Sequence, residues 1–506
     1  MSLNRPPLHR SAWTTEEISQ FSQIKRFMER FQGDPVFRTR LPQEMQACSA
    51  EYGFNLDPET LRCLWDVDLK LELLKGERHD YRLPPLVAKY RDWIGERLRW
   101  REHVRNACAP QEPRWRSWRE RQMNRAQSEM GEAWSRTIIF DTAAIELSKG
   151  CSVGCWFCGV DAPRLEDHFY YTPENARFFR GVLEVLVDLV GAEAASAHFL
   201  YWASDPLDNP DYEQYCQDYR DVIGVYPLTT TALPLRDPER THNLLRMLME
   251  DDSGVHRFSI LTLKQLNQVH QEFSPEELAR VELCLLNPES ILVKANAGRF
   301  RKKAETRPKL LAHENNKMMS VDKHLLDEWE GYAGPGTIAC VSGLLLNLVE
   351  RTVKLITPCK ANDRWPLGYI VFGEGKFETP SELRSVVESI IGTCMTAQVP
   401  VAETIRFRQD LSLELSDEGF AVFTPFKGAK FGGNGSSAYF KDLGAMVGEG
   451  THSAGAIADR LLARHAIFHS DTYRNLDWMF DRGLLHEEPP PPVRPEALVH
   501  LGGRAS

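Results

Sequence analysis

The chain has 506 residues, of which 42% are hydrophobic and 26% charged, and its formal net charge at pH 7 is -10. This length corresponds to about three domains of typical size, and the composition excludes a disordered, collagen-like or coiled-coil protein. No apolar run is long enough for a membrane span and the start lacks the apolar core of a signal peptide, so we expect a cytoplasmic protein without a membrane partner. The negative charge gives no reason to expect a nucleic acid as partner.

The first predicted part is a small helical domain over residues 14–75. Thr14 can cap a helix whose first turn carries Glu16 and Glu17, and apolar residues follow at helical spacing. A second capping signal at Asp57-Pro58 opens another short helix after a loop. The segment therefore reads as several helices around one core.

Residues 76–136 form a predicted helical connector rich in arginine and aromatic residues. Arginines alternate there with Trp93, Trp100, Trp115 and Trp118. Two interpretations are open. The tryptophans could stack on exposed bases, or they could face the core of an amphipathic helical pair whose arginines are solvated or paired with nearby glutamates.

Between residues 137 and 360, short apolar strands alternate with longer helical stretches. Strands are predicted at 137–146, 197–202, 225–231, 257–262 and 290–294, and helices at 173–190, 238–250 and 275–284. Alternation of this kind is typical of βαβ units with a mostly parallel sheet. The predicted fold class is α/β, an α/β layer or partial barrel with a helical domain before it.

The remaining chain divides into a mixed connector over 361–404, a winged-helix-like domain over 405–488 and a proline-rich tail over 489–506. In the second of these, two strands and a glycine-rich turn at 432–435 precede predicted helices at 453–465 and 470–482. This order of elements is the layout of a winged-helix module.

Three of the eleven cysteines stand close together. Cys151, Cys155 and Cys158 occur in the stretch CSVGCWFC, directly after a predicted strand, where α/β folds place ligand sites. Gly150 and Gly154 allow a tight path on which the three sulfurs can converge. Structural zinc usually takes four ligands, and no second pair of ligands follows at zinc spacing. Three cysteines on an iron–sulfur cubane would leave the fourth iron open.

The CxxxCxxC spacing with Phe157 before the last cysteine, followed by a βα-repeat domain, resembles the radical S-adenosylmethionine (SAM) superfamily over residues 137–360. The resemblance implies a (β/α)6-type partial barrel and one [4Fe-4S] cluster held by the three cysteines. It also implies that the open iron binds SAM and cleaves it to a 5′-deoxyadenosyl radical. Zinc, a purely redox cluster and a structural cysteine knot are the alternatives.

The resemblance extends to residues that would contact SAM. The segment Ala203-Ser204-Asp205-Pro206 matches by position, although not by identity, the Gly-Gly-Glu-Pro type segment that contacts the SAM amino group in that superfamily. A turn capped by Asp205 would also explain the segment. Phe157, Thr230 and Asn296 complete the expected cofactor-binding set, with Ser259 at a further strand end.

Both ends of the chain indicate a peptide substrate. Residues 14–75 are similar to the Nif-type leader of precursors of ribosomally made, modified peptides, and residues 405–488 are similar to the winged-helix element that holds such leaders. The three parts together resemble the radical SAM peptide epimerases, which invert L-residues in a precursor peptide. The implied partners are a precursor peptide, bound by 405–488 and also by 14–75, and an electron donor such as flavodoxin or ferredoxin.

Epimerisation by this route needs a thiol that returns a hydrogen atom to the opposite face of Cα. Cys359 ends an apolar strand beside a polar turn, and its surroundings resemble the segment with the donor cysteine in the epimerases. Cys340 is the second candidate, and Cys284 is placed in a helix outside the catalytic layer. Peptide crosslinking and a non-catalytic iron–sulfur redox sensor are the competing functions.

Overall fold

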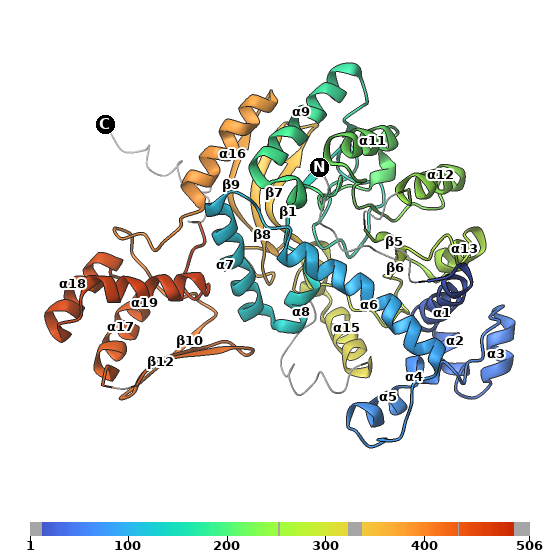
Figure 1. Ribbon diagram of the computed structural model, residues 1–506, viewed down its shortest axis with the longest axis horizontal. Helices are drawn as coiled ribbons and strands as arrows, with labels where there is room; N and C mark the ends of the chain where they lie inside the picture. The colour runs from blue at the N-terminus through green and yellow to red at the C-terminus, as the bar shows by residue number, and fades with distance from the viewer. Residues whose placement is uncertain (1–12, 251–253, 322–335, 434, 490–506) are drawn as a thin grey trace.

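The computed structural model describes residues 13–250, 254–321, 336–433 and 435–489, and it has a mixed α/β fold. Figure 1 shows the amino-terminal helices at one end of the molecule, the carboxyl-terminal domain at the other, and the central sheet with its helices between them. Except for Pro489, the predicted tail lies outside the described residues. Among the described residues, no helix combines the length and the apolar character needed to cross a bilayer.

The amino-terminal part is helical. α1 (Thr15–Gly33) begins at Thr14, whose hydroxyl accepts the Glu17 N–H while the Glu17 carboxylate accepts the Thr14 N–H, so the predicted cap is confirmed. Shorter helices follow: α2 (Pro35–Arg40), α3 (Met45–Glu51), α4 (Arg62–Trp65) and α5 (Val67–Leu74). Phe21, Phe27 and Phe37 are fully buried in their shared core.

Two long helices, α6 (Pro85–Asn106) and α7 (Pro113–Met130), connect this part to the sheet, and α8 (Glu132–Thr137) follows them. The four tryptophans, Trp93, Trp100, Trp115 and Trp118, are buried, which confirms the core interpretation and removes them as base-stacking platforms. Several arginines, expected at the surface, are also buried. Arg119 donates to the Phe140 carbonyl and Arg121 pairs with Glu487, because the helices are covered by other parts of the chain.

The central domain contains two groups of strands. In the first, β1 (Asp141–Glu146) pairs in parallel with β7 (Val341–Asn347), and β8 (Thr352–Pro358) and β9 (Tyr369–Lys376) continue the sheet in antiparallel fashion. In the second, β4 (Thr230–Thr231), β5 (His256–Ile260) and β6 (Val281–Leu285) are parallel. Single-residue parallel bridges join Phe199 to Ala144 and to Leu228, so the two groups are linked.

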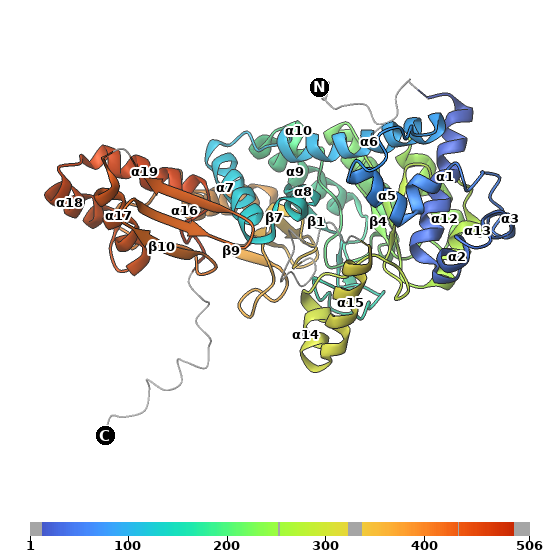
Figure 2. The ribbon, with the colours of Figure 1, turned by 90° about the horizontal axis from the view of Figure 1, so that it is seen from below.

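Helices cover the outer face of these strands. They are α9 (Pro173–Val190), α10 (Ala192–Ala195), α11 (Tyr212–Ile223), α12 (Pro238–Leu248), α13 (Leu263–Glu272) and α16 (Pro380–Cys394). The apolar faces of these helices other than α13 share one core with β1, β7 and β8 (Figure 1). α13 packs instead in a second core with β5 and β6. α14 (Gly298–Thr306) and α15 (Pro308–Val321) stand out from the domain in Figure 2. In the described part of the chain, the strands do not close into a barrel.

Several sequence predictions for this domain are corrected. The helix expected at 275–284 is wrong: its second half is β6, whose alternating buried and half-buried residues pair with β5. The strand expected at 290–294 is also absent, because that segment forms turns and extended chain without ladder partners. The strand expected at 137–146 begins only at Asp141, since α8 extends to Thr137.

In the carboxyl-terminal domain, a three-stranded antiparallel sheet is followed by three helices. The strands are β10 (Ser412–Ser416), β11 (Gly419–Phe423) and β12 (Gly428–Gly432), and the helices are α17 (Ser437–Glu449), α18 (Ala454–His465) and α19 (His469–Asp481). The sequence analysis missed β12 and α17. β12 has glycine at both ends, and its place depends on Phe431, which stacks on Phe420 at 4.3 Å.

The segment after α19 ties this domain to the central one. The Glu487 carboxylate accepts from Arg121 at 2.7 Å and from Gln122 at 2.8 Å. Glu488 accepts from the Trp365 indole at 2.8 Å and pairs with Arg364 at 3.0 Å. Because the Arg121–Glu487 pair is largely buried, it fixes the position of the domain more firmly than an exposed ion pair would.

Candidate active site

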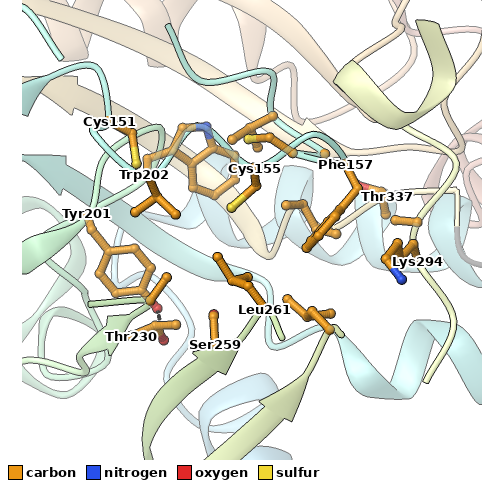
Figure 3. A pocket seen from close by; sticks show the side chains of 18 of the residues that line it. Cys151, Cys155, Phe157, Tyr201, Trp202, Thr230, Ser259, Leu261, Lys294 and Thr337 are labelled. Carbon is orange, nitrogen blue, oxygen red and sulfur yellow. Dashed lines mark hydrogen bonds between the residues drawn. The ribbon is translucent and has the colours of Figure 1, made fainter. Parts of the chain in front are cut away.

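The three clustered cysteines line one cavity of about 410 Å³ in the central domain. Its walls come from the cysteine loop, from the segment after Phe199, from the ends of β4 and β5, from α7 and α8 near residues 130–138, and from residues near 294 and 337. Of the residues singled out from the sequence, Cys151, Cys155, Phe157, Cys158, Ser204, Asp205, Thr230 and Ser259 line it. Figure 3 shows Cys151 and Cys155 on one side of the cavity and Thr230 and Ser259 on the opposite side.

The cysteine loop leaves the end of β1 between two short strands, β2 (Ser148–Lys149) and β3 (Asp167–His168), which pair with each other. Gly150 has a φ of +84°, and a Cβ there would lie 2.1 Å from the Arg164 carbonyl oxygen. The Cys151 N–H donates to the Pro163 carbonyl at 3.0 Å. The loop is therefore closed at its base by backbone contacts that only glycine at position 150 permits.

A buried carboxylate holds the first half of the loop. Asp208, in the 3-10 helix η1 (Pro206–Asp208), accepts the Ser152 N–H at 2.8 Å and the Ser152 hydroxyl at 2.5 Å. Arg236 donates to the same carboxylate at 2.8 Å. The Asp208 side chain is fully buried, whereas that of Arg236 is 45% exposed. This contact joins the cysteine loop to the segment that follows Asp205.

An arginine of α14 holds the second half of the loop. The Arg299 guanidinium donates to the Cys155 carbonyl at 2.9 Å and to Asp161 at 2.9 Å, and its backbone N–H donates to the Cys158 carbonyl at 2.8 Å. A Cβ on Gly298 would lie 2.3 Å from the Gly159 carbonyl oxygen. The backbone of α14 therefore contacts the cysteine loop directly.

The thiols themselves are partly buried. Burial raises the pKa of Cys151 to about 12 and that of Cys155 to about 11. Such thiols ionise when a bound cation offsets the effect of burial, as at metal sites. Within the described residues, no three His, Cys, Asp or Glu side chains form a ligand group for a single metal ion.

Next to the cysteines, Asp205 is held by its own loop. Its carboxylate accepts from the Thr231 hydroxyl at 2.7 Å, the Ala232 N–H at 2.7 Å and the Leu207 N–H at 3.0 Å, and burial raises its pKa to about 6. Behind it, Glu146 accepts the Ala203 N–H at 2.7 Å. Burial raises the pKa of Glu146 to about 7. Both carboxyl groups position the 203–205 segment against the cavity.

The wall across from this segment carries a lysine that the sequence analysis missed. Lys294 is buried, its backbone N–H donates to Glu314 at 3.0 Å, and its ammonium lies 5.2 Å from the centre of the Phe157 ring. Burial lowers the pKa of Lys294. The sequence signal that could have indicated Lys294 is a charged residue directly after the apolar run ILV.

Comparison with known proteins gives this chain a family. No family model matches the sequence. The uncharacterized protein y4wI of Sinorhizobium fredii is 37% identical over 412 residues, which cover 80% of this chain and 77% of that protein. The chain belongs to the y4wI family. Because that relative is described as uncharacterized, membership assigns no activity.

One solved structure also resembles part of this y4wI-family chain. It is a crystal structure of BtrN in complex with AdoMet and 2-DOIA, with a TM-score of 0.22 and 16% identity. The similarity covers 28% of this chain and 56% of BtrN, little more than half of that protein. A similarity of this extent supports no conclusion about the y4wI family.

The remaining predicted site residues of this y4wI-family protein lie outside the residues that line the cavity. Asn296 lies two residues after Lys294, and its side-chain oxygen is buried without a hydrogen-bond partner in the described structure. Cys359 is 1% exposed, and burial raises its pKa well above the ordinary value. Cys340 is half-buried and packs against two buried clusters, one with Val341 and one with Phe140.

Cys284 is not where the sequence analysis placed it. It lies on β6 opposite Ser259 of β5, which lines the cavity, and both side chains are half-buried on the same face of the strands. The helix assigned to 275–284 would have put this thiol outside the catalytic layer. The structure puts it on the inner face instead.

Proposed function

We propose that this protein is a radical SAM enzyme. The observation that carries the proposal is that Cys151, Cys155 and Cys158 line one cavity at the carboxyl end of β1, at the spacing of that superfamily. Three cysteines lining one cavity, where α/β folds bind ligands, would suit a cluster with one open iron. The parallel segments from β7 through β1 to β6 support assignment to the superfamily's partial (β/α)6 barrel.

In this proposal the three cysteines would hold the [4Fe-4S] cluster. With SAM bound and one electron supplied by a reductant, the cluster would provide a 5′-deoxyadenosyl radical for abstraction of a hydrogen atom from the substrate. Ser204 and Thr230 present hydroxyl groups to the cavity, and Asp205 fixes the turn that carries Ser204. Lys294 lines the same cavity, with its ammonium paired to the buried Glu314 carboxylate at 3.5 Å.

A precursor peptide is the proposed substrate. Residues 405–488 have strands followed by helices, as leader-recognition elements do. β12 is an edge strand, so its outer backbone groups can pair with an added peptide strand. Trp478 of α19 meets Phe431 of β12 at 5.2 Å and is 42% exposed, which provides an apolar contact beside that edge. The Nif-type resemblance of residues 14–75 supports a second contact with the leader.

Within this class, inversion of L-residues at Cα is the reaction we propose. Cys359 would return a hydrogen atom from the face opposite the abstraction. Burial keeps the Cys359 thiol protonated, as a hydrogen donor requires. Two residues on, the Ala361 N–H donates to the carbonyl of Gly336, which lines the cavity, at 2.9 Å. Cys359 is proposed ahead of Cys340 because its segment resembles the one with the donor cysteine in the epimerases.

Peptide crosslinking is the second candidate function. It is favoured by the position of Cys359 outside the lining of the cavity, because crosslinking needs no hydrogen-donating thiol.

The test is anaerobic incubation of the iron-reconstituted enzyme with SAM, reductant and a Nif-type precursor peptide in D2O, followed by mass spectrometry. Epimerisation predicts one deuterium gained at each modified residue by wild type and by the control Cys394→Ala, but not by Cys359→Ala. A loss of two hydrogen atoms per modification would instead establish crosslinking. Deuterium uptake by Cys359→Ala would transfer the donor role to another thiol, with Cys340→Ala and Cys284→Ala as the next variants.

A further inference from the structure

The charge of α14 and α15 is opposite to that of the chain as a whole. The chain carries a net charge of -10, whereas residues 298–321 contain seven lysines and arginines against two glutamates, a net charge of +5. Figure 2 shows these two helices standing out from the central domain. A local excess of positive charge on an acidic protein attracts negatively charged partners to one place.

This basic element lies against the cysteine loop. Besides the bonds from Arg299, the ring of Phe300 lies 5.9 Å from that of Trp156, and the Lys303 ammonium lies 5.4 Å from the Trp156 ring. Trp156 stands between Cys155 and Phe157 in the loop. A partner bound to α14 would therefore lie next to the part of the chain that carries the cysteines.

Several charges of this surface are available to a partner. Arg307 and Lys309 are exposed, and neither they nor Lys303 have an acidic partner in the described part of the chain. Lys302 pairs with Asp161 but is 61% exposed. The loop itself reaches the surface at Ser152 and Gly154, so a docked protein can approach it closely.

We propose that the basic surface formed by Lys302, Lys303, Arg307 and Lys309 docks an acidic one-electron carrier protein of the flavodoxin type. The inference rests on the proposed function, which requires a reductant at the cysteine loop. The carrier is oxidised by one electron in each encounter, and the group held by the loop is reduced by one. Complementary charge speeds such an encounter and orients it, and electron-transfer interfaces are small and transient.

The test is binding of oxidised flavodoxin to the iron-loaded enzyme, measured by surface plasmon resonance at low and high salt. The test variant combines Lys303→Glu, Arg307→Glu and Lys309→Glu. Its control combines Arg91→Glu, Lys264→Glu and Lys376→Glu, three exposed basic residues elsewhere, so that the net charge is the same. We expect binding about tenfold weaker than wild type in the test variant alone, with the difference vanishing near about 0.5 M salt.

The docking proposal is overturned if wild type does not bind flavodoxin, or if the test and control variants bind it equally. It is also overturned if the test variant keeps flavodoxin binding and loses precursor-peptide binding, since the surface would then serve the peptide. Formation of 5′-deoxyadenosine with dithionite, which needs no docking, separates the two hypotheses. If wild type fails there, the proposed function fails, whatever flavodoxin does.

Discussion

Asp208 is expected to hold the cysteine loop in place, and Asp208→Ala tests this directly. The change removes the acceptor of the Ser152 N–H and hydroxyl and the partner of Arg236. A hydrogen bond to a charged group contributes about 1.5–3 kcal/mol. Because Arg236 is 45% exposed, water replaces much of its lost contact, and we assign the effect mainly to the two Ser152 bonds. Two bonds of this kind give a local loss of about 3–6 kcal/mol.

The lost stability is confined to the cysteine loop. Amide hydrogen exchange reports the stability of such a segment, whereas global unfolding of a chain with several domains does not isolate it. Amide exchange in a peptide spanning residues 148–160 should accelerate by a factor of about 100 to 20,000 in Asp208→Ala, from about 3–6 kcal/mol at 1.4 kcal/mol per tenfold change. Ser152→Ala keeps the backbone bond and removes only the hydroxyl bond, so it should show about half of the effect, about 1.5–3 kcal/mol. Iron incorporation should also fall, and it should fall further in Asp208→Ala than in Ser152→Ala.

The reasoning is refuted if exchange in this peptide is the same in Asp208→Ala and wild type. It is also refuted if Ser152→Ala has the larger effect, because the backbone N–H would then not depend on the carboxylate.

Three further perturbations have defined outcomes. Gly150→Ala should abolish iron incorporation, because the added Cβ would lie 2.1 Å from the Arg164 carbonyl oxygen. Gly154→Ala, at a φ of +66° but with no atom within 4 Å of the added Cβ, should keep most of the iron. Equal iron contents in the two variants would contradict the account. Burial raises the folded-state pKa of Glu146 from 4.5 to about 7, so its contribution to stability is complete below pH 4.5 and is lost as the pH rises through 7. Wild type should therefore lose up to about 3 kcal/mol over this window in urea titrations relative to Glu146→Gln, and parallel pH profiles would refute this. Thr14→Ala should destabilise α1 by about 1 kcal/mol, seen as faster amide exchange at its first turn but not at its last.

Local signals in the sequence were sufficient for elements that carry their own boundaries. α9 runs from Pro173 to Val190 as expected, because Thr172 caps it, proline occupies its first turn and Gly191 follows it. The cysteine loop was found in the same way, from spacing within one short stretch. Neither feature depends on residues far along the chain.

The misses depend on distant partners. Asp208 acts on a residue 56 positions earlier and Arg299 on one 144 positions earlier, so no local pattern indicates either role. The stretch VELCL was assigned to a helix, although its alternation of apolar and other residues fits a strand. Pairing with β5 makes it a strand and places Cys284 on the inner face. Lys294 was passed over because its partner, Glu314, lies beyond a helix that the sequence analysis did not assign.

The most direct test of the central claim is the formation of 5′-deoxyadenosine. Iron-reconstituted enzyme is incubated anaerobically with SAM and dithionite, and the nucleoside is quantified by chromatography. The account predicts product from wild type and from Cys394→Ala, and none from Cys151→Ala, Cys155→Ala or Cys158→Ala. Product from any of these three variants, or none from fully iron-loaded wild type, would contradict it.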